Sequence, residues 1–495
     1  MPSFPGGMEW TLASVFVPLT GALLCFLLPR RAPLLGRLTA LLTVAAVLGL
    51  LLTVLAEGTQ QTALGGWPAP LGILWRADGL SVALMAMTAL VGLGVSVYAH
   101  AYFRDKHTEG AFFWPLWLML WTALDALFLS RDLFNLYVTL ELVGFAAASL
   151  TALDGSAAAL RGAIRYLLIS MLGSLSYLLG VALIYHACGS VDIVLVAERI
   201  GTAPDLVVAV ALGTMTAGLV LKTALFPLHF WLPPAHGSAP APVSAVLSAL
   251  VVKASFYLLL RLWLEVFDGG GPWLAEFLGV LGAVAVVWGS VAALRQARLK
   301  LLMAYSTVAQ IGYFFMAFPL AAVGGGAVWA GALYLVLAHG LAKAAMFLSV
   351  GSVLRFARHD RIDELDRIVH RLPLTLTAFA LAGVSIMGLP PSGGFIGKWL
   401  MLEAAFRQGR YGFVAVILLG GVLAAAYVFR VVGHAFTPTA RAQRAREVPA
   451  AMEWSALLLA LAAILLGLLP PLVLPLLEIG QVAVVSGVAA PAGSG

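Results

Sequence analysis

The sequence predicts an all-α polytopic membrane protein with about fourteen transmembrane helices. Two observations predict this class. Of its 495 residues, 62% are hydrophobic and only 11% are charged, whereas a soluble domain carries about 25% charged residues. Apolar runs of about 20 residues, the length that a bilayer requires, also follow one another along the chain. These features exclude a soluble or nucleic-acid-binding protein, and the net charge of +6 suits the loops of a membrane protein.

The apolar runs place the spans, in chain order, at 11–29, 34–56, 80–100, 112–129, 133–153, 163–187, 205–226, 241–262, 273–294, 301–320, 327–354, 373–406, 411–435 and 452–475. The opening residues "MPSFPGGMEW" lack the basic region of a signal peptide, so we expect the first span to remain as a helix. The twelfth run is too long for one straight helix. It contains "GLPPSGGFIGK", whose prolines and glycines should open the backbone midway.

Basic loop residues predict the orientation of the chain. Loops after odd-numbered spans carry roughly three times as many lysines and arginines as loops after even-numbered spans, and basic loops stay in the cytoplasm. We therefore expect a multi-pass protein of the cell membrane with both termini outside. The segment 355–371, "RFARHDRIDELDRIVHR", is then a cytoplasmic connector. Its alternating charges predict a solvated amphipathic helix rather than an active site.

The two cysteines predict neither a disulfide nor a metal site. Cys25 falls near the inner end of the first span and Cys188 near the outer end of the sixth, so they should not meet. No Walker loop, dinucleotide fingerprint, CxxC or HExxH motif stands in a convincing context. The sequence therefore predicts no bound cofactor.

Lysines inside the predicted spans are the main functional signal. Each costs about 2.5–3.5 kcal/mol if it is centred in lipid, so such residues must face the protein interior or water. Four of them favour an ion-transport role over structural ion pairing and conflict with a purely structural scaffold. Arg430 also lies in a span, but near a helix end, where its side chain can reach the interface. The four lysines are Lys222, Lys253, Lys343 and Lys398.

Acids and histidines accompany these lysines. Glu141, in "LYVTLELVGF", lies near the centre of the fifth span, whereas Asp125 lies closer to a span end, where we expect an interfacial or capping role. The late position of Glu403 in the twelfth span leaves its role open. His339 and Lys343 are four residues apart, so they share a helix face about 6 Å apart along the axis. Such a pair is at least as compatible with a proton relay as with a satisfied core histidine.

The stretch "KTALFPLHFWLPPAH", from Lys222 to His236, combines a lysine with a broken helix. Its prolines should end the helix and free backbone groups that water in a cavity must satisfy. A buried lysine can exchange a proton near neutral pH, and a nearby carboxylate favours its charged form, so the two titrate as a unit. His236 and His229 should line the route of the proton, although a hydrogen bond to the freed backbone explains His229 equally well.

The two predicted breaks also suggest internal symmetry. When spans 4–8 and 9–13 are grouped as five-helix units, each break falls in the fourth member of its unit. Because five is odd, the second unit enters the membrane from the opposite side, which makes the units inverted repeats. The expected organisation is three N-terminal spans in 1–110, the two repeats in 111–262 and 273–436, and a final span with a tail in 451–495.

The segment "LKTALFPLHFWLPPAHGSAPAPVSAVLSALVVKASFY", 221–257, closely resembles the signature of the antiporter-like membrane subunits. That family includes proton-pumping subunits of respiratory complex I, subunits of membrane-bound hydrogenases and subunits of Mrp-type Na⁺/H⁺ antiporters, and the resemblance extends over nearly the whole chain. It implies a polar axis across the membrane centre. The residues that match this axis are Glu141 on helix 5, Lys222 on helix 7, Lys253 on helix 8, His339 and Lys343 on helix 11, and Lys398 on broken helix 12.

Within the family, the wording of this segment is most similar to the Mrp D component of the multisubunit antiporters. The resemblance thus implies a proton-translocating subunit of a multisubunit Na⁺/H⁺ antiporter, with H⁺ and Na⁺ as the transported ions and other membrane subunits as partners. The alternative is a proton-pumping subunit of an NADH:quinone oxidoreductase or a membrane-bound hydrogenase, in which partners carry out the electron chemistry. Lys398, in place of a glutamate, departs from one complex I subunit. The chain by itself is not expected to be an enzyme.

Overall fold

The structure, a computed structural model, describes residues 9–267, 270–439 and 446–480. Within these ranges, 13 helices are long and apolar enough to cross a membrane. Two shorter helices, α15 and α16, together cover the predicted twelfth span, so the prediction of about fourteen spans is confirmed. The helices that build the spans are α1 (Trp10–Leu27), α2 (Ala32–Glu57), α3 (Gly79–Tyr102), α4 (His107–Leu129), α5 (Leu133–Thr151), α6 (Ala157–Cys188), α8 (Asp205–Thr223), α10 (Ala241–Val246), α11 (Val252–Glu265), α12 (Pro272–Leu294), α13 (Leu299–Gly324), α14 (Gly326–Ala357), α15 (Pro373–Met387), α16 (Gly393–Arg407), α17 (Tyr411–His434) and α18 (Ala450–Leu465). The remaining elements are β1 (Gln60–Ala63), β2 (Leu74–Ala77), α7 (Ile193–Arg199), α9 (Leu232–Ser238) and α19 (Pro470–Glu478).

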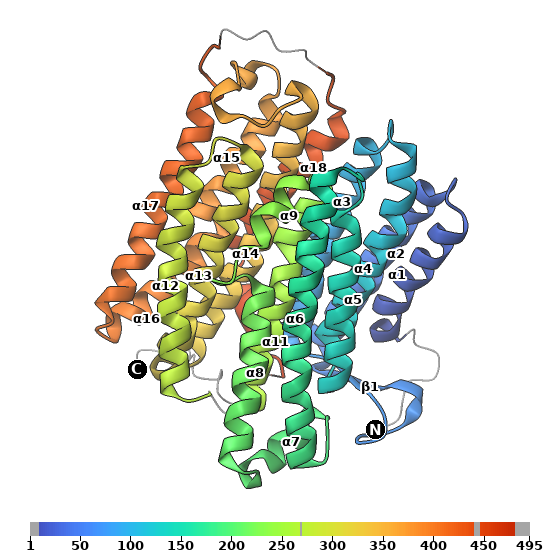
Figure 1. Cartoon of the computed structure of the whole chain (residues 1–495), viewed down its shortest axis with the longest axis vertical. Helices are drawn as coiled ribbons and strands as arrows, with labels where there is room; N and C mark the ends of the chain where they lie inside the picture. Colours follow the sequence, from blue (N-terminus) through green and yellow to red (C-terminus); the bar gives the residue numbers. More distant parts are fainter. Residues whose placement is uncertain (1–8, 268–269, 440–445, 481–495) are drawn as a thin grey trace.

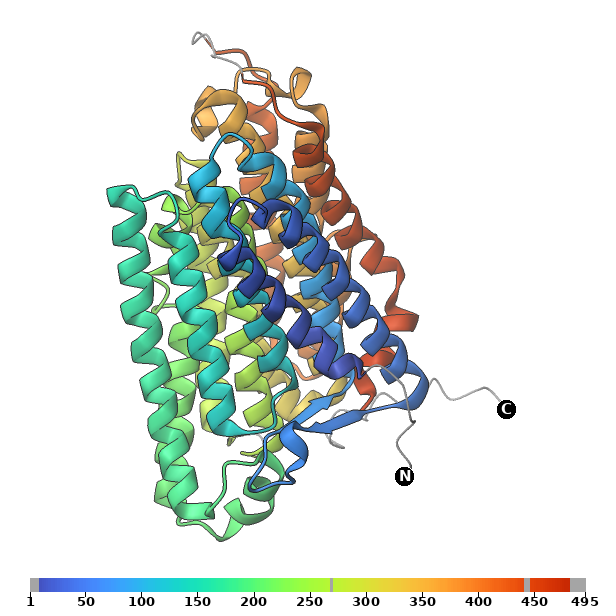
Figure 2. The same cartoon turned by 90° about the vertical axis from the view of Figure 1, so that its right-hand side faces the viewer.

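Two spans form the interior of the helical bundle (Figure 1). The most apolar windows of the span 241–265 and of α14 are 100% buried, whereas those of α1 and α2 are only 39% buried. α14 packs against α3, α10, α13, α15, α16 and α18. Many leucines of α1 and α2 are exposed, such as Leu23 at 57% and Leu42 at 60%, and Figure 2 shows both helices running obliquely at one side of the bundle. Charged side chains on the two central spans are therefore shielded from lipid.

Glycines allow the helices to approach closely. A Cβ atom at Gly282 of α12 would lie 2.5 Å from the carbonyl oxygen of Gly312 in α13. A Cβ atom at Gly218 of α8 would lie 2.2 Å from the carbonyl oxygen of Gly173 in α6. Such small-residue contacts are typical of helix packing in membranes, where lipid provides no hydrophobic drive between helices.

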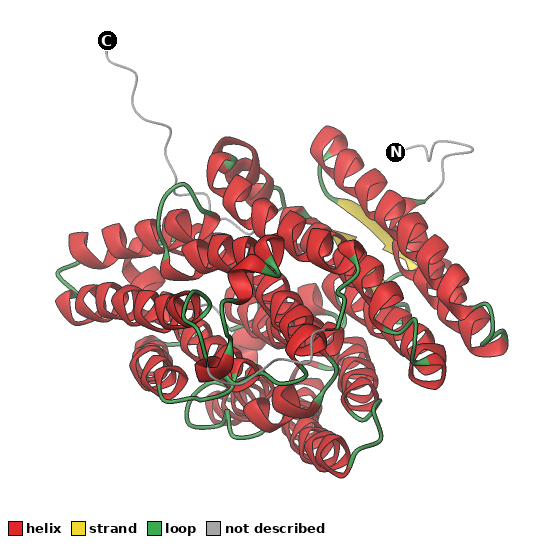
Figure 3. Cartoon of the chain, turned by 90° about the horizontal axis from the view of Figure 1, so that it is seen from above, coloured by secondary structure: helices red, strands yellow, loops and turns green. Residues whose placement is uncertain are grey.

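The two ends of the bundle carry different connections. At one end lies an antiparallel hairpin of β1 and β2, with Gln60 opposite Ala77, together with the short helix α7. Figure 1 shows both near its lower edge, and the view along the bundle in Figure 3 shows the strands at the periphery. Neither element is predicted by hydropathy, because short polar strands and a single helical turn or two produce no apolar run of span length.

The prediction of an amphipathic helix over 355–371 is wrong. α14 continues to Ala357, and Arg358 then adopts a left-handed conformation with φ of 63°, which ends the helix. Beyond it the chain forms two 3₁₀ turns, Ile362–Glu364 and Ile368–His370. Its backbone pairs with the α12–α13 connection instead, since Leu299 N donates to Asp360 O at 2.7 Å and Ile362 N donates to Ala297 O at 2.9 Å.

Both predicted helix breaks are present. α8 ends at Thr223, where Ala224 takes a left-handed conformation with φ of 60°, and the chain resumes a helix only at α9. α15 ends at Met387, followed by Gly388 with φ of 83°, and α16 begins at Gly393. The structure also contains a third irregularity, which was not predicted. α10 continues through a π turn, Leu247–Val251, before α11 begins. π turns occur frequently at functional sites.

Candidate functional site

The first candidate group is an ion pair between α5 and α8. Lys222 Nζ lies 3.6 Å from Glu141 Oε1. The ammonium also donates to the carbonyl oxygen of Ser170 at 3.2 Å and to the hydroxyl of Ser174, both on α6. The side chains of Lys222 and Glu141 are 7% and 16% exposed. The pairing that the resemblance implies is therefore present in the structure.

The helix break beside Lys222 is stabilised by side chains. Trp231 Nε1 donates to the carbonyl oxygen of Leu221 at 3.0 Å, and Thr223 Oγ1 donates to Ser255 Oγ at 3.0 Å. A cavity of about 10 Å³, lined by Lys222, Tyr166 and Trp231 among others, lies at this point. A cavity of this size holds about one water molecule, so the break leaves room for a single water beside the ammonium.

Lys253 lies immediately after the π turn. Its side chain is fully buried, and its ammonium donates to the carbonyl oxygen of Ser248 within that turn. Ser248 Oγ in turn lies 2.8 Å from Thr307 Oγ1 of α13. The π turn thus provides the buried lysine with a carbonyl acceptor.

Lys343 is held by α13. Its ammonium donates to the carbonyl oxygen of Met303 at 3.0 Å and to Ser306 Oγ at 2.8 Å. Ser306 Oγ donates to the hydroxyl of Tyr427 on α17 at 2.9 Å. Gln310, one turn along α13 from Ser306, is only 1% exposed. The hydroxyl and amide groups of α13 therefore extend the polar surroundings of Lys343 toward α17.

Lys398 uses the second helix break directly. Its ammonium donates to the carbonyl oxygens of Ile386 at 2.8 Å and Met387 at 3.3 Å, which are the last residues of α15. It also lies 4.4 Å from the centre of the Tyr313 ring, a cation–π distance. The carbonyls that the break frees thus bind this lysine, which explains why a lysine and a broken helix occur together in the sequence.

The candidate histidines differ in their surroundings. His339 is 1% exposed and lies within electrostatic range of Lys253, Lys343 and Lys398. His236 is fully buried, stacks on Phe347 at 4.8 Å between ring centres, and lies within range of Lys253 and Lys343. Neither imidazole has a hydrogen-bond partner among the described residues. These two buried histidines therefore lie near lysines of the central spans.

His229 lies apart from this group. Its ring contacts the indole of Trp288 at 4.5 Å and stacks on Phe226 at 5.6 Å between ring centres. Tyr305 lies 6.4 Å from it, again between ring centres. The structure thus brings Lys222, Lys253, His236, His339, Lys343 and Lys398 into the interior of the bundle. Glu141 contacts Lys222 from a partly exposed position on α5, and His229 lies in an aromatic environment at the edge of the break.

Two further acids, Asp125 and Glu403, lie in different surroundings. Asp125 is 0% exposed and lies inside α4, whose C-cap is Ser130, so the expected interfacial or capping role is wrong. Leu127, Phe128 and Leu129 extend the helix one turn beyond it and bury it. Glu403, whose role was open, forms a 2.6 Å ion pair with Arg407 at an exposed edge of α16.

Two buried cations that lie at the ends of predicted spans were not recognised from the sequence. Lys300 lies in the first turn of α13, is 6% exposed, and donates to the carbonyl oxygen of Ala239 at the end of α9. It is also within electrostatic range of His236. Arg261 lies four residues before the end of α11 and is 5% exposed. The predicted span 301–320 begins one residue after Lys300, whereas Arg261 lies just inside the end of the predicted span 241–262.

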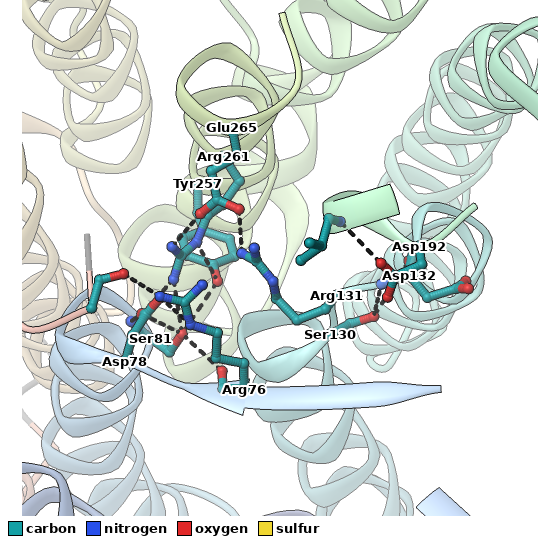
Figure 4. Close-up of polar contacts among 12 residues, drawn as sticks. Arg76, Asp78, Ser81, Ser130, Arg131, Asp132, Asp192, Tyr257, Arg261 and Glu265 are labelled. Atoms are coloured by element: carbon teal, nitrogen blue, oxygen red, sulfur yellow. Dashed lines mark hydrogen bonds and ion pairs between the residues drawn. The ribbon is translucent and has the colours of Figure 1, made fainter. Parts of the chain in front are cut away.

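Arg261 belongs to a second buried cluster near the hairpin (Figure 4). Its guanidinium contacts Asp78 and also donates to Glu265 at 2.7 Å, while Arg131 contacts Glu265. Arg76 lies 3.7 Å from Asp78. Burial raises the pKa of the Asp78 carboxyl, but the charge and hydrogen bonds of Arg261 together with the Ser81 amide outweigh it, so the pKa lies below its ordinary value. The cluster ties β2, the α4–α5 connection and α11 together.

The two polar regions share one helix face. Lys253, Tyr257, Arg261 and Glu265 follow one another at four-residue spacing along α11, which places them on one side of that helix. Tyr257 is 3% exposed, its hydroxyl donates to the carbonyl oxygen of Phe128 at 2.6 Å, and it accepts from Arg261 Nε at 3.0 Å. A polar stripe thus runs from the bundle interior to the end that carries the hairpin.

The chain resembles known proteins over most of its length. Residues 130–424 match the family described as "NADH:quinone oxidoreductase/Mrp antiporter, TM". The N subunit of the NADH-quinone oxidoreductase of Desulforudis audaxviator is 37% identical over 468 residues, which cover 88% of this chain and 92% of that protein. The D component of the Na⁺/H⁺ antiporter of Bacillus subtilis is 27% identical over 435 residues, covering 86% and 87% of the two chains.

A solved structure has the same architecture. A chain of the membrane-bound sulfane sulfur reductase, an archaeal respiratory membrane complex, superposes with a TM-score of 0.88 at 26% identity, covering 97% of this chain and 98% of that chain. The family match includes α5 to α16 and most of α17, and thus all of the buried lysines described above. The chain belongs to the NADH:quinone oxidoreductase/Mrp antiporter family of antiporter-like membrane subunits.

Proposed function

We propose that this chain is the proton-translocating membrane subunit of a multisubunit respiratory complex. One observation carries the proposal: four lysines are buried in the bundle interior on four different helices, each with its ammonium bound by carbonyl or hydroxyl oxygens, and only one of them contacts a carboxylate among the described residues. A scaffold would gain nothing from this arrangement, because each uncompensated charge in the membrane interior costs several kcal/mol.

In this proposal the lysines exchange protons in turn. Lys222 accepts or releases a proton as its distance from Glu141 changes, because the carboxylate stabilises the charged ammonium. Lys253 and Lys343 follow, with His236 and His339 between them, and Lys398 ends the series at the second break. Neutral oxygen atoms can accept a hydrogen bond from either form of the amine, so a lysine that they bind is not committed to one protonation state.

The partial exposure of Glu141 supports a contact between α5 and another membrane subunit. Its side chain retains 16% exposure on the outward face of α5, next to Val138 and Leu142, which are 38% and 41% exposed. A partly exposed carboxylate facing lipid would be costly. We therefore propose that another membrane subunit covers this face and that its charges influence the Glu141–Lys222 pair.

The identity values favour a respiratory assembly over an antiporter. The N subunit of the oxidoreductase is 37% identical to this chain and the D component of the antiporter is 27% identical, at nearly equal coverage. The second candidate is the Na⁺/H⁺ antiporter, which the amino-acid sequence of 221–257 predicts. In either assembly this chain would move protons, and in a respiratory complex its partners would carry out the electron transfer.

Purification of the native complex through a tag on this chain tests the proposal. We expect hydrophilic iron–sulfur and flavin subunits to co-purify, and reconstituted vesicles to acidify when a quinone is reduced. Co-purification of small antiporter subunits, with proton movement driven by a Na⁺ gradient, would instead establish the second candidate. Isolation of this chain alone from its native membrane, with robust ion exchange by the single chain, would contradict both.

A further inference from the structure

A cavity of about 710 Å³ opens at the end of the bundle opposite the hairpin, between the α1–α2 turn and the α3–α4 connection. Arg30, His100, Arg104 and His107 line it, and no Asp or Glu of the described chain does. Phe103 and Trp114, which are 5% and 1% exposed, form part of its buried wall. This cavity lies outside the lysine series and has no role in the proposed proton path.

The four basic side chains are available to a ligand. None of them forms an ion pair or a side-chain hydrogen bond with any described residue. The two nearest acids are already engaged, because Asp105 pairs with Arg355 at 3.1 Å and with Arg446 at 2.6 Å, and Glu109 pairs with Lys106 at 2.9 Å. The positive charge in the cavity is therefore not neutralised by the described part of the protein.

The surroundings of the cavity are those of a membrane interface. Phe112, which is 55% exposed, lines it, and Leu34 and Leu38 of α2, shortly after Pro33 of the cavity lining, are 51% and 50% exposed. The N-terminus of α4 also opens here, since Lys106 provides no side-chain cap for its amides. A group with a negative head and apolar chains fits both parts of this surface, because basic pockets between transmembrane helices bind anionic headgroups.

We propose that this cavity binds the phosphate-bearing headgroup of one anionic phospholipid, with Arg30 and Arg104 contacting the phosphate and the acyl chains lying along α2 and Phe112. Arginine suits this role because its planar guanidinium donates two parallel hydrogen bonds to phosphate oxygens. The headgroup would join the α1–α2 turn to the α3–α4 connection, which share no ion pair among the described residues.

Native mass spectrometry of the purified complex tests this site. The complex is reconstituted in nanodiscs of phosphatidylcholine with a minor fraction of phosphatidylglycerol and then released from them. We expect about one phosphatidylglycerol to remain per copy of this chain, and about a tenfold lower retention in the double variant Arg30→Gln/Arg104→Gln, because two charge-assisted contacts are lost. The control Arg31→Gln/Arg358→Gln changes two exposed arginines that do not line the cavity, and it should retain the lipid like the wild type.

A second variant tests the cavity without removing charge. Thr108→Trp should fill the space that Thr108 lines and expel the lipid, while the melting temperature and assembly of the complex stay unchanged. Three results would overturn the proposal. The first is equal lipid retention by the double variant and the wild type. The second is displacement of the lipid by millimolar inorganic phosphate, which would indicate a free-anion site, and the third is crosslinking of a photoreactive group at Phe112 to another subunit instead of to lipid.

Discussion

Each buried lysine has its own set of oxygen ligands, and these sets differ in one respect. Lys222 contacts a carboxylate, whereas Lys253, Lys343 and Lys398 rest on backbone carbonyl and hydroxyl oxygens. The charge of Lys222 is therefore stabilised by an acid whose own side chain reaches the outer surface of α5. Any group that approaches Glu141 from outside would alter the electrostatic environment of this lysine first.

Replacing Glu141 tests this asymmetry. Glu141→Gln keeps the size of the side chain but removes its charge, so Lys222 should no longer hold a proton in competition with bulk water. We expect proton translocation by the assembled complex to fall at least about tenfold, and Glu141→Asp to retain partial activity.

The control for this series is Glu403→Gln. Glu403 is an exposed acid paired with Arg407, and its loss should leave the translocation rate unchanged. Native gels establish that each variant assembles. A Glu141→Gln complex that translocates protons at the wild-type rate would show that the pair has no role in transport.

At the scale of elements, the helix breaks are the feature that sequence reasoning predicted best. Clustered prolines and glycines disfavour helix continuation, so "FPLHFWLPP" and "GLPPSGG" locate the breaks that the structure contains. The π turn before Lys253 has no such residues, and nothing in "LSALV" distinguishes it from an ordinary helix. Lys300 and Arg261 lie at the ends of the predicted spans 301–320 and 241–262, where hydropathy defines helix boundaries only to within a few residues, so their burial could not be predicted.

Contacts between different helices and connections could not be predicted from the sequence pattern alone. The pairing of Glu141 with Lys222 could be inferred only through a family resemblance, since the two residues lie on different spans. The charged segment after α14 has the composition of a helix, but its backbone groups pair with the α12–α13 connection instead. Tertiary contacts thus override a local pattern where another segment offers hydrogen-bond partners.

The first break should depend on Trp231. Trp231→Phe keeps an aromatic ring but removes the donor that satisfies the carbonyl of Leu221, and an unsatisfied buried carbonyl costs about 1–3 kcal/mol. We expect a lower melting temperature and slower proton translocation. Trp454→Phe, at a 49% exposed position on α18, is the matched control and should change neither property. An unchanged melting temperature in Trp231→Phe would mean that the break is satisfied in another way.

At the scale of the whole molecule, two polar regions stabilise different parts of the bundle. The lysine series occupies the interior around α14, and the cluster of Arg76, Asp78, Arg131, Arg261 and Glu265 joins distant segments at the end that carries the hairpin. The same end contains a backbone hydrogen bond of 2.9 Å from Gly79 N to Ile479 O, which links α3 to the end of α19. Segments from opposite ends of the sequence are thus held together there.

Asp78→Asn should destabilise the whole chain. Removing one member of a buried ion pair leaves the other charge uncompensated and costs about 3–5 kcal/mol. Because the pKa of Asp78 in the folded protein is lowered, its contribution is present above about pH 4 and is lost as the pH falls through the folded pKa. Thermal unfolding of the purified protein at neutral pH measures the effect. Glu198→Gln, an exposed acid of α7, is the control, and equal melting temperatures for the two variants would contradict a stabilising role for the cluster.

The orientation of the chain is a prediction that labelling can test. In a variant with Cys25 and Cys188 replaced by alanine, a cysteine at position 61 in the hairpin should react with an impermeant maleimide only from outside, and one at position 363 only from the cytoplasm. Gln61 and Asp363 are both exposed. The hairpin and the α14–α15 connection, to which they belong, lie at opposite ends of the bundle (Figure 1). Labelling of both positions from one side would contradict the orientation that the basic loops predict.

The most direct test of the proposed function is the replacement of Lys222 by arginine in the intact complex. Arginine keeps the positive charge and can still contact Glu141, but it does not release its proton at any relevant pH. Formation of a pH gradient is measured in vesicles that contain the assembled complex, with Lys106→Arg, an exposed lysine paired with Glu109, as the matched control. If Lys222 exchanges protons, Lys222→Arg should abolish the gradient while Lys106→Arg preserves it. A full gradient in the Lys222→Arg complex would show that this residue is a fixed charge and that protons cross the membrane by another route.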